Sequence, residues 1–428
     1  MDGIFQNKIN DLKKQNLYRD QNSINERLSR QQELINFSSN DYLGLAECSI
    51  SEILNINSRD YNNSANNSIG LGRVTKQTSS ENAEIGVSLH TQLMQVPFGS
   101  SGSRLTTGTH LEHKELEDCI SNWKASKDTI VFSSGYLANL GALSALIDKE
   151  DVVFIDELAH SCMWDALRIN NVRKYIFAHN DTRELKTIIQ KYRHQYTNSF
   201  IITESVFSMD GDLAPLDDLK SIADEYSSFL YIDEAHSTGI YGATGAGLIS
   251  EYKEKNPEQD FSNLIQMGTL SKAIGLEGGY ISGSYSLIDF LRNKARTYVY
   301  STASSPFLMK IAQHNIKKII HENDLRQKLF SNIKYLDSLL GNLKAKNEID
   351  SESKFHWTNF GSPIFTIQFQ DINECLTVSK KLLEKGFICT SIRPPTVKIA
   401  RLRICISSKH SHDKILSFYT ALSIALAA

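Results

Sequence analysis

Residues 228–239 read SFLYIDEAHSTG, and residues 263–273 read NLIQMGTLSKA. Each stretch begins with a short apolar run, typical of a buried strand, and then passes into small and hydroxyl-bearing residues. Asp233 closes the first run, and Lys272 lies in the loop after the second. The pattern predicts two strands of a sheet whose ends present a carboxylate and an amine.

The same alternation of short apolar runs and longer helical patterns extends from about Thr129 to Ser284. Such alternation indicates right-handed βαβ units, and therefore an α/β fold with a mostly parallel sheet flanked by helices. The predicted strands are TIVFSS, DVVFID, KYIFAH, SFIITES, SFLYIDEA, NLIQMGTL and GYISGS.

Outside this region the alternation of apolar runs and helical patterns changes, which suggests additional domains or segments. We predict an N-terminal arm at residues 1–45, a large domain at 46–305 and a smaller C-terminal α/β domain at 306–428. Residues 46–98, and above all 56–82, are rich in Asn and Ser and poor in aliphatic clusters. This composition is typical of a mobile surface insertion rather than of a sheet.

In open α/β sheets, ligands bind beyond the carboxyl ends of the strands. Polar residues suited to binding or catalysis follow five of the predicted strands, so we expect a site at that edge. They are Ser134, Gly135 and Tyr136, then His160, then Ser205 and Ser208, then Asp233 and His236, and finally Lys272.

The chemistry of Lys272 and Asp233 points to pyridoxal 5'-phosphate (PLP). A lysine amine forms a Schiff base with the cofactor aldehyde, and a carboxylate keeps the pyridine nitrogen protonated so that the ring accepts electrons. His236, in the same turn as Asp233, is expected at the phenolic oxygen, and His160 is expected to stack on the ring face. Taken singly, each would more often be a capping or structural residue.

Several further residues are candidates for the phosphate and the substrate. Backbone N–H groups of Gly135 and Tyr136 open a helix after a strand, where phosphate binds well. The hydroxyls of Thr269, Ser271 and Thr302 are additional candidates, although hydroxyl residues in loops are not specific. Arg393, stiffened by the two prolines that follow it, can grip a carboxylate, whereas its structural alternative is a surface arginine in a turn.

Composition excludes some classes of protein. The chain of 428 residues carries 46 basic and 49 acidic side chains, a net charge of -3, so no global field favours nucleic acid or an anionic membrane. Its six cysteines include no C-x-x-C pair, which favours reduced thiols over disulfides or a metal site. The N-terminus is polar, and no apolar stretch approaches the ~18 residues of a membrane span. We expect a cytoplasmic enzyme.

A set of sequence blocks resembles the α-oxoamine synthase family of PLP enzymes, which have fold type I. The resemblance covers most of the chain apart from residues 46–98. The blocks occur in the family's order: NFSSNDYLGL, HLEHKELE, VFSMDGDLAPL, DEAHSTG, GTLSKA, YSTASSP and RPPTV with ARLRICIS.

The resemblance implies roles for individual residues. Lys272 would form the Schiff base, Asp233 would hold the ring nitrogen, and His160 would lie on the ring face. Thr302 would reach the phosphate of a neighbouring subunit, which implies a homodimer. The remaining implied residues are His236 and Ser208 near the phenolic oxygen, Gly135, Tyr136, Thr269 and Ser271 at the cofactor, and Arg19, Arg393 and Thr396 at the substrate.

Within the family, VFSMDGD and IRPPTV are most similar to the members of the biotin pathway that condense L-alanine with a pimeloyl thioester. The small-molecule substrates would then be an amino acid and an acyl-CoA or acyl carrier protein. Members that use acetyl-CoA, form 5-aminolevulinate or condense long acyl chains remain alternatives, as does a non-catalytic regulatory subunit. Two departures from the family, the Asn/Ser-rich segment and Leu276-Glu277 after the lysine loop, bear on the acyl channel.

Overall fold

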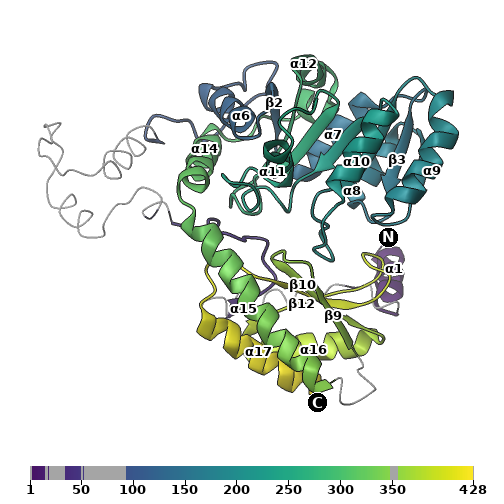
Figure 1. Ribbon diagram of the computed structural model, residues 1–428. Helices are drawn as coiled ribbons and strands as arrows, with labels where there is room; N and C mark the ends of the chain where they lie inside the picture. The colour runs from purple at the N-terminus through teal and green to yellow at the C-terminus, as the bar shows by residue number, and fades with distance from the viewer. Residues whose placement is uncertain are drawn as a thin grey trace, which may run out of the picture. The chain divides into compact units, whose positions relative to one another are not determined.

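The computed structural model describes residues 2–14, 18, 34–49, 52, 93–347 and 355–427 (Figure 1). The predicted insertion at 56–82 and the candidate residue Arg19 lie outside this set. The chain divides into two compact units. Unit 1 comprises Met1–Tyr42, Val206–Leu213 and Asp324–Ala428, and unit 2 comprises Leu43–Ser205 and Ala214–Asn323.

Unit 2 is built on a seven-stranded sheet, which confirms the expected α/β fold. All seven predicted strands form, and their order across the sheet is β2-β8-β7-β6-β5-β3-β4. Only β8 runs against the others. The strands are β2 (Asp128–Phe132), β3 (Val152–Asp156), β4 (Arg173–Phe177), β5 (Ser199–Glu204), β6 (Phe229–Asp233), β7 (Leu264–Thr269) and β8 (Gly279–Gly283).

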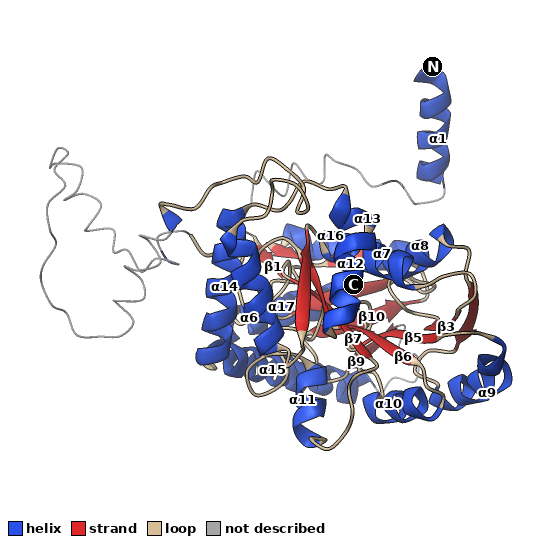
Figure 2. Ribbon diagram, turned by 90° about the horizontal axis from the view of Figure 1, so that it is seen from above, coloured by secondary structure: helices blue, strands red, loops and turns tan. Residues whose placement is uncertain are grey.

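The central strands are covered on both faces, because every residue of β3, β5, β7 and β8 is buried. A parallel sheet requires such cover, and the unbroken apolar runs of the sequence reflect it. Helices flank the sheet (Figures 1 and 2). Those in contact with its strands are α6 (Leu111–Trp123), α7 (Gly135–Leu146), α9 (Thr182–Tyr192), α10 (Leu216–Glu225) and α12 (Tyr285–Lys294). The unit also contains α8 (Ser161–Ile169), α11 (Leu248–Lys255), α13 (Arg296–Val299) and α14 (Pro306–His321).

Strand register brings the ends of β5, β6 and β7 into line. Glu204 pairs with Asp233, and Asp233 pairs with Met267 on the next strand. Asp233 therefore lies in the middle of the sheet, at the edge where the carboxyl ends of the parallel strands meet.

A buried ion pair fixes the turn that follows β6. Lys124 Nζ lies 2.6 Å from Glu234 Oε2, and both side chains are 0% exposed. The ammonium also donates to Thr238 Oγ1 at 3.3 Å and to the Ala246 carbonyl at 2.5 Å. Since Lys124 caps the C-terminus of α6, this pair ties the helix to the turn that follows Asp233 and contains His236.

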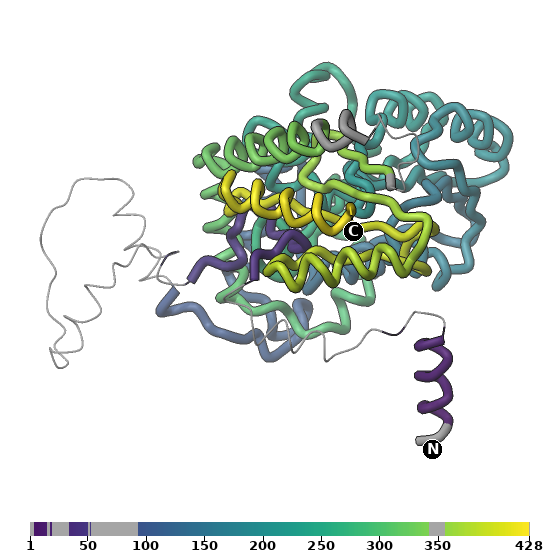
Figure 3. The backbone as a smooth tube through the Cα atoms, turned by 90° about the horizontal axis from the view of Figure 1, so that it is seen from below, coloured from purple at the N-terminus to yellow at the C-terminus, as the bar shows by residue number. Residues whose placement is uncertain are grey.

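Unit 1 contains a four-stranded antiparallel sheet and a two-stranded parallel one. The larger sheet has the order β12 (Thr390–Ile392), β13 (Arg401–Cys405), β10 (Ile364–Phe369) and β9 (Phe355–Asn359), and the smaller pairs β1 (Ile35–Asn36) with β11 (Phe387–Ile388). The unit's helices are α1 (Asp2–Lys14), α15 (Asp324–Asn347), α16 (Ile372–Glu384) and α17 (His412–Ala427). Figure 3 shows α17, in yellow, running alongside α15 and α16, against which it packs.

Aromatic stacking holds the core of unit 1 together. The ring of Phe37 stacks on Phe418 at 4.0 Å and on His410 at 4.1 Å.

Helix α14 belongs to unit 2, so the boundary between the units falls near residue 324 rather than at 306, where the sequence suggested a domain boundary. Within the described residues, no helix combines the length and apolarity that crossing a bilayer requires.

Candidate active site

A cavity of about 290 Å³ lies at the carboxyl edge of the sheet in unit 2. The structure brings together there nine of the residues singled out from the sequence. The lining consists of Ser134, Gly135, Tyr136, Asn139, His160, Cys162, Glu204, Asp233, Ala235, His236, Met267, Thr269, Ser271 and Lys272.

The amine of Lys272 lies against His236. Lys272 Nζ is 2.7 Å from His236 Nε2, and the lysine is half-buried whereas the histidine is buried. In PLP the phenolic oxygen and the aldehyde occupy adjacent ring positions. A histidine in contact with the amine that meets the aldehyde is therefore also suitably placed for the phenolic oxygen.

Asp233 is held from two sides. Its Oδ1 accepts a hydrogen bond from the backbone N–H of Ala235 at 2.8 Å, and its Oδ2 accepts one from Asn139 Nδ2 at 2.7 Å. The residue is only 4% exposed, yet it lines the cavity. N–H donors on both oxygens stabilise a charged carboxylate, which is the form that pairs with a protonated pyridine nitrogen.

His160 caps the N-terminus of α8 at the cavity wall. Its Nδ1 accepts from the backbone N–H of Cys162 at 3.4 Å and lies 2.9 Å from Cys162 Sγ. The residue as a whole is exposed, yet loss of solvent around its imidazole is the main reason that the pKa of His160 is lowered. The charge of Lys272 lowers the pKa further, while Asp233 acts in the opposite direction. A neutral imidazole is suited to stacking on an aromatic ring.

The N-terminus of α7 and the lysine loop form the opposite wall. Ser134 Oγ accepts from the backbone N–H of Leu137 at 3.1 Å, which starts the helix directly after β2. The first amides of a helix have no partner inside it and bind anions. Thr269 Oγ1 lies 2.8 Å from Ser271 Oγ and adds hydroxyls to this side. The phosphate of PLP fits this set of donors.

Glycines bring this helix close to the sheet. A Cβ on Gly279 would lie 2.5 Å from the Cα of Gly135, and a Cβ on Gly135 would lie 3.2 Å from Met267 Cε and from Thr269 Oγ1. Tyr136, beside Gly135, donates its hydroxyl to Asp165 of α8 at 2.5 Å. Its predicted role at the cofactor therefore rests on its backbone N–H.

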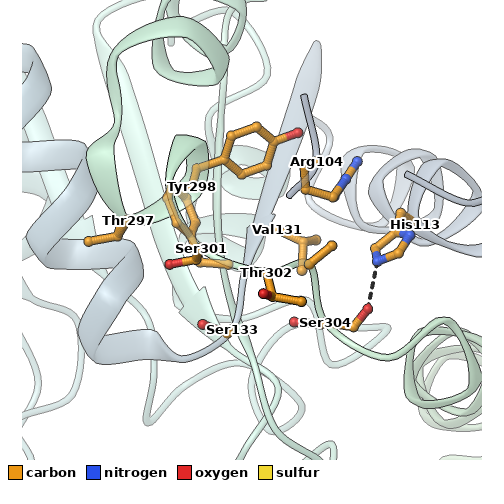
Figure 4. Close-up of a pocket in the computed structure, with 11 residues that line it drawn as sticks. Arg104, His113, Val131, Ser133, Thr297, Tyr298, Ser301, Thr302 and Ser304 are labelled. Atoms are coloured by element: carbon orange, nitrogen blue, oxygen red, sulfur yellow. Dashed lines mark hydrogen bonds between the residues drawn. The ribbon is translucent and has the colours of Figure 1, made fainter. Parts of the chain in front are cut away.

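Thr302 lies apart from this cavity within the described chain. It lines a pocket of about 10 Å³ together with Ser133, Tyr298, Ser301 and Ser304 (Figure 4). Its strand bridge to Ser103 joins two loops of unit 2. The expected contact of Thr302 with a neighbouring subunit's phosphate remains a prediction.

Three other candidates, Ser208, Arg393 and Thr396, belong to unit 1, and their roles also remain predictions. There, Arg393 Nη2 donates to the Tyr18 carbonyl at 3.0 Å, and the Ser208 carbonyl accepts from Arg403 Nε at 2.6 Å. Leu276, in unit 2, packs against the apolar cluster of Leu93 and Ile311.

Asn139 and Cys162 are cavity residues that sequence reasoning missed. Asn139 lies within the helix GYLANLGALSAL, whose other residues are mostly apolar or small. A lone amide in such a helix, one turn beyond a predicted phosphate-binding turn, was the available signal. Cys162 follows His160 by two residues, and nothing in the sequence marks it as part of the site.

Comparison with known families places most of the chain in one of them. The family model for aminotransferase class I and II matches residues 32–422. A Nostoc protein provisionally named 8-amino-7-oxononanoate synthase is 38% identical over 384 residues, which cover 90% of this chain and 87% of the relative. A Nostoc punctiforme protein of the same provisional name is 39% identical over 391 residues, covering 91% and 87% of the two chains.

Solved structures show the same fold. Serine palmitoyltransferase from Sphingomonas wittichii superposes with a TM-score of 0.75 at 23% identity, covering 92% of this chain and 87% of that one. The 8-amino-7-oxononanoate synthase from Francisella tularensis superposes with a TM-score of 0.68 at 25% identity, covering 92% and 98%. Both confirm the predicted fold type I architecture.

Proposed function

Because the chain belongs to the α-oxoamine synthase family, within aminotransferase class I and II, we propose that it condenses L-alanine with a pimeloyl thioester. The product would be 8-amino-7-oxononanoate, an intermediate of biotin biosynthesis, with release of carbon dioxide and of the thiol. The observation that carries this proposal is the 36–39% identity, over about nine-tenths of the chain, to relatives provisionally named for that activity.

The chain is a PLP-dependent enzyme, and its cavity suits that cofactor. Lys272 supplies the amine for the aldehyde, Asp233 the carboxylate for the ring nitrogen, and the start of α7 the donors for the phosphate. These three features line one cavity, in the chemical classes that the three functional groups of PLP require. When bound, PLP supplies a protonated ring that takes up negative charge from the Cα of an attached amino acid.

The residues of the cavity then have distinct tasks. Asp233, fixed by Asn139 and Ala235, holds a proton at the ring nitrogen. The Lys272 amine would take the α-proton of the amino acid, and His236 would hold the phenolic oxygen of the cofactor. His160 would cover one ring face and exclude water from it. Each task rests on a group held in place before substrate arrives, which is where an enzyme gains rate.

Substrate selection is assigned to two arginines and a threonine. Arg393, with Thr396, would bind the carboxylate of alanine, and Arg19 would bind the distal carboxylate of the pimeloyl group. The acyl group would arrive on CoA or on a carrier protein. A homodimer would let Thr302 of each subunit serve the other subunit's phosphate, so that two identical sites form together.

The alternatives are less well supported. Similarity to serine palmitoyltransferase at 23% identity carries the fold and not the substrate. A non-catalytic regulatory subunit would not require a lysine at the cofactor aldehyde, and Lys272 is present in the cavity.

A substrate matrix tests the proposed function. Purified protein reconstituted with PLP would be assayed for thiol release with alanine, glycine or serine, each combined with pimeloyl-CoA, acetyl-CoA or palmitoyl-CoA. We expect the alanine and pimeloyl-CoA pair to give the highest kcat/KM, with 8-amino-7-oxononanoate as product. A preference for glycine with acetyl-CoA, or for serine with palmitoyl-CoA, would overturn the substrate assignment while leaving the PLP site intact.

A further inference from the structure

Asn139 occupies a central position in the wall of the cavity. It lies in α7, is 1% exposed and makes three side-chain contacts. Its Oδ1 accepts from the hydroxyl of Tyr231 at 2.8 Å. Its Nδ2 donates to Asp233 Oδ2 at 2.7 Å and to Cys162 Sγ at 3.1 Å. One amide therefore joins two strand residues of β6 to the first turn of α8.

Strand geometry explains why one side chain can reach both Tyr231 and Asp233. Residues two apart on a strand point to the same face of the sheet. Helix α7 packs on β7 and β8, and β7 is the neighbour of β6. Asn139 therefore faces a hydroxyl and a carboxylate together. The backbone positions of β6 and α7 therefore determine this arrangement of Asn139, Tyr231 and Asp233.

The contacts also determine which way the amide points. A carboxylate accepts hydrogen bonds and donates none when ionised, so it must face the NH₂ group and not the oxygen of Asn139. The phenol of Tyr231 then donates to Oδ1. Burial, followed by the nearby charge of Asp233, raises the pKa of Tyr231, so the hydroxyl keeps the proton that it donates.

The second hydrogen of Asn139 Nδ2 connects the amide to His160 through the sulfur of Cys162. Burial raises the pKa of Cys162, so the sulfur stays a thiol, which accepts from Asn139 and can donate to His160 Nδ1 at 2.9 Å. The backbone N–H of Cys162 points to the same ring nitrogen at 3.4 Å. Nδ1 is therefore an acceptor, and the proton of the neutral imidazole is on Nε2.

We propose that Asn139 is a positioning residue that fixes the carboxylate of Asp233 directly and the ring of His160 through Cys162. The inference rests on the proposed PLP chemistry, since these are the groups assigned to the ring nitrogen and to the ring face. It does not depend on which acyl thioester the enzyme uses. Asn139 acts on the charge state of the ring through Asp233 and on ring stacking through His160.

The central test replaces Asn139 and follows the bound cofactor spectroscopically. Asn139→Leu keeps the approximate volume but removes both donors, and Asn139→Asp keeps the shape but sets a second carboxylate against Asp233. The readouts are the pH titration of the visible absorbance of bound PLP, and kcat per bound PLP with KM for alanine. In metal sites, removing residues that orient ligands typically costs about 10- to 100-fold. We expect a fall of that order in kcat, a KM changed by less than about threefold, and an absorbance titration displaced in both variants, more in Asn139→Asp.

Two further variants test separately the contact of Asn139 with Cys162 and its contact with Tyr231. Cys162→Ala breaks only the path to His160, so it should lower kcat less and leave the absorbance titration where the wild type has it. Tyr231→Phe removes the contact that orients the amide, so it should displace the titration in the same direction as Asn139→Leu but by a smaller amount. These two changes preserve most of the packing and remain informative if Asn139→Leu fails to fold.

Asn332→Leu in α15 is the matched control. Asn332 is also 1% exposed and donates through Nδ2 to two acceptors, the carbonyls of Ser407 and His410 in unit 1. This variant should lower the thermal midpoint without moving the absorbance titration. If Asn139→Leu behaved in the same way, with wild-type kcat per bound PLP, its role would be structural and the inference would be wrong. Failure of the proposed function would show differently, as a wild-type protein that binds no PLP or uses other substrates.

Discussion

Lys272 Nζ and His236 Nε2 lie 2.7 Å apart although 36 residues separate them in the chain. The contact arises because β6 and β7 are neighbours and run parallel, so the turns after them meet at one edge of the sheet. Asp233 ends β6 and His236 lies in the turn after it, whereas Lys272 lies in the loop after β7. The topology of the sheet thus brings these three side chains to one cavity.

Lys272→Ala should abolish turnover and the yellow colour of the lysine-bound cofactor, because we assign no other amine to the aldehyde. PLP should still bind noncovalently through its phosphate, with reduced affinity. Absorbance spectra and retention of PLP on gel filtration would check both points. A variant with wild-type turnover would remove Lys272 from the mechanism.

Asp233→Asn should preserve the fold and lower kcat by several orders of magnitude, since a neutral amide does not hold the proton on the ring nitrogen. The thermal midpoint should change little, because an amide can still accept from Ala235. Steady-state kinetics on PLP-saturated protein would measure the effect. Activity within threefold of the wild type would contradict the assigned role.

Glu234→Gln should destabilise unit 2 strongly, because it leaves the buried ammonium of Lys124 without its counter-charge. Breaking a buried ion pair in this way typically costs about 3 to 5 kcal/mol. Asp118→Asn is the matched control, since the Lys114–Asp118 pair is more than half exposed on both sides and an exposed pair contributes about 0 to 1 kcal/mol. Denaturant unfolding of both variants would test the difference, and equal losses would contradict it.

His410 should make unit 1 sensitive to mild acid. Burial lowers the pKa of His410 to about 4 from the ordinary value of 6.5. The folded state therefore binds the proton less readily than the unfolded state, and the stability associated with this group is lost as pH falls from 6.5 towards 4. His410→Asn should flatten the dependence of the thermal midpoint on pH in that window, relative to His194→Gln on the exposed turn after α9. Parallel slopes in the two variants would argue against His410 as the source.

Arg393→Ala should raise KM for alanine while sparing PLP binding. A charge-assisted pair contributes roughly 1.5 to 3 kcal/mol, which corresponds to about 10- to 150-fold in KM. Arg19→Ala should instead narrow the preference for pimeloyl-CoA over acetyl-CoA. Kinetics of the two variants against both substrates would separate the two arginines, and an unchanged KM for alanine in Arg393→Ala would refute its assignment.

The strands of unit 2 could be predicted because each is a short, continuous apolar run bounded by polar turns. Their shared edge then followed from the general behaviour of parallel sheets, and Asp233, His236 and Lys272 line one cavity at that edge. The pairing of Lys124 with Glu234 could not be predicted, since 110 residues separate them and no local pattern marks a buried lysine. Asn139 was missed for a related reason, because its importance comes from three partners on other elements.

The close contact between Gly135 and Gly279 places a limit on variation in this site. Neither glycine offers a charge or a hydrogen-bonding side chain, yet a methyl group at residue 279 would meet the backbone of α7 at 2.5 Å. The helix would have to move away from the sheet, and its first amides would move with it. The absence of side chains at Gly135 and Gly279 therefore sets the spacing between these amides and the lysine loop. A substitution at either glycine that adds only a methyl group could still deprive the enzyme of its cofactor.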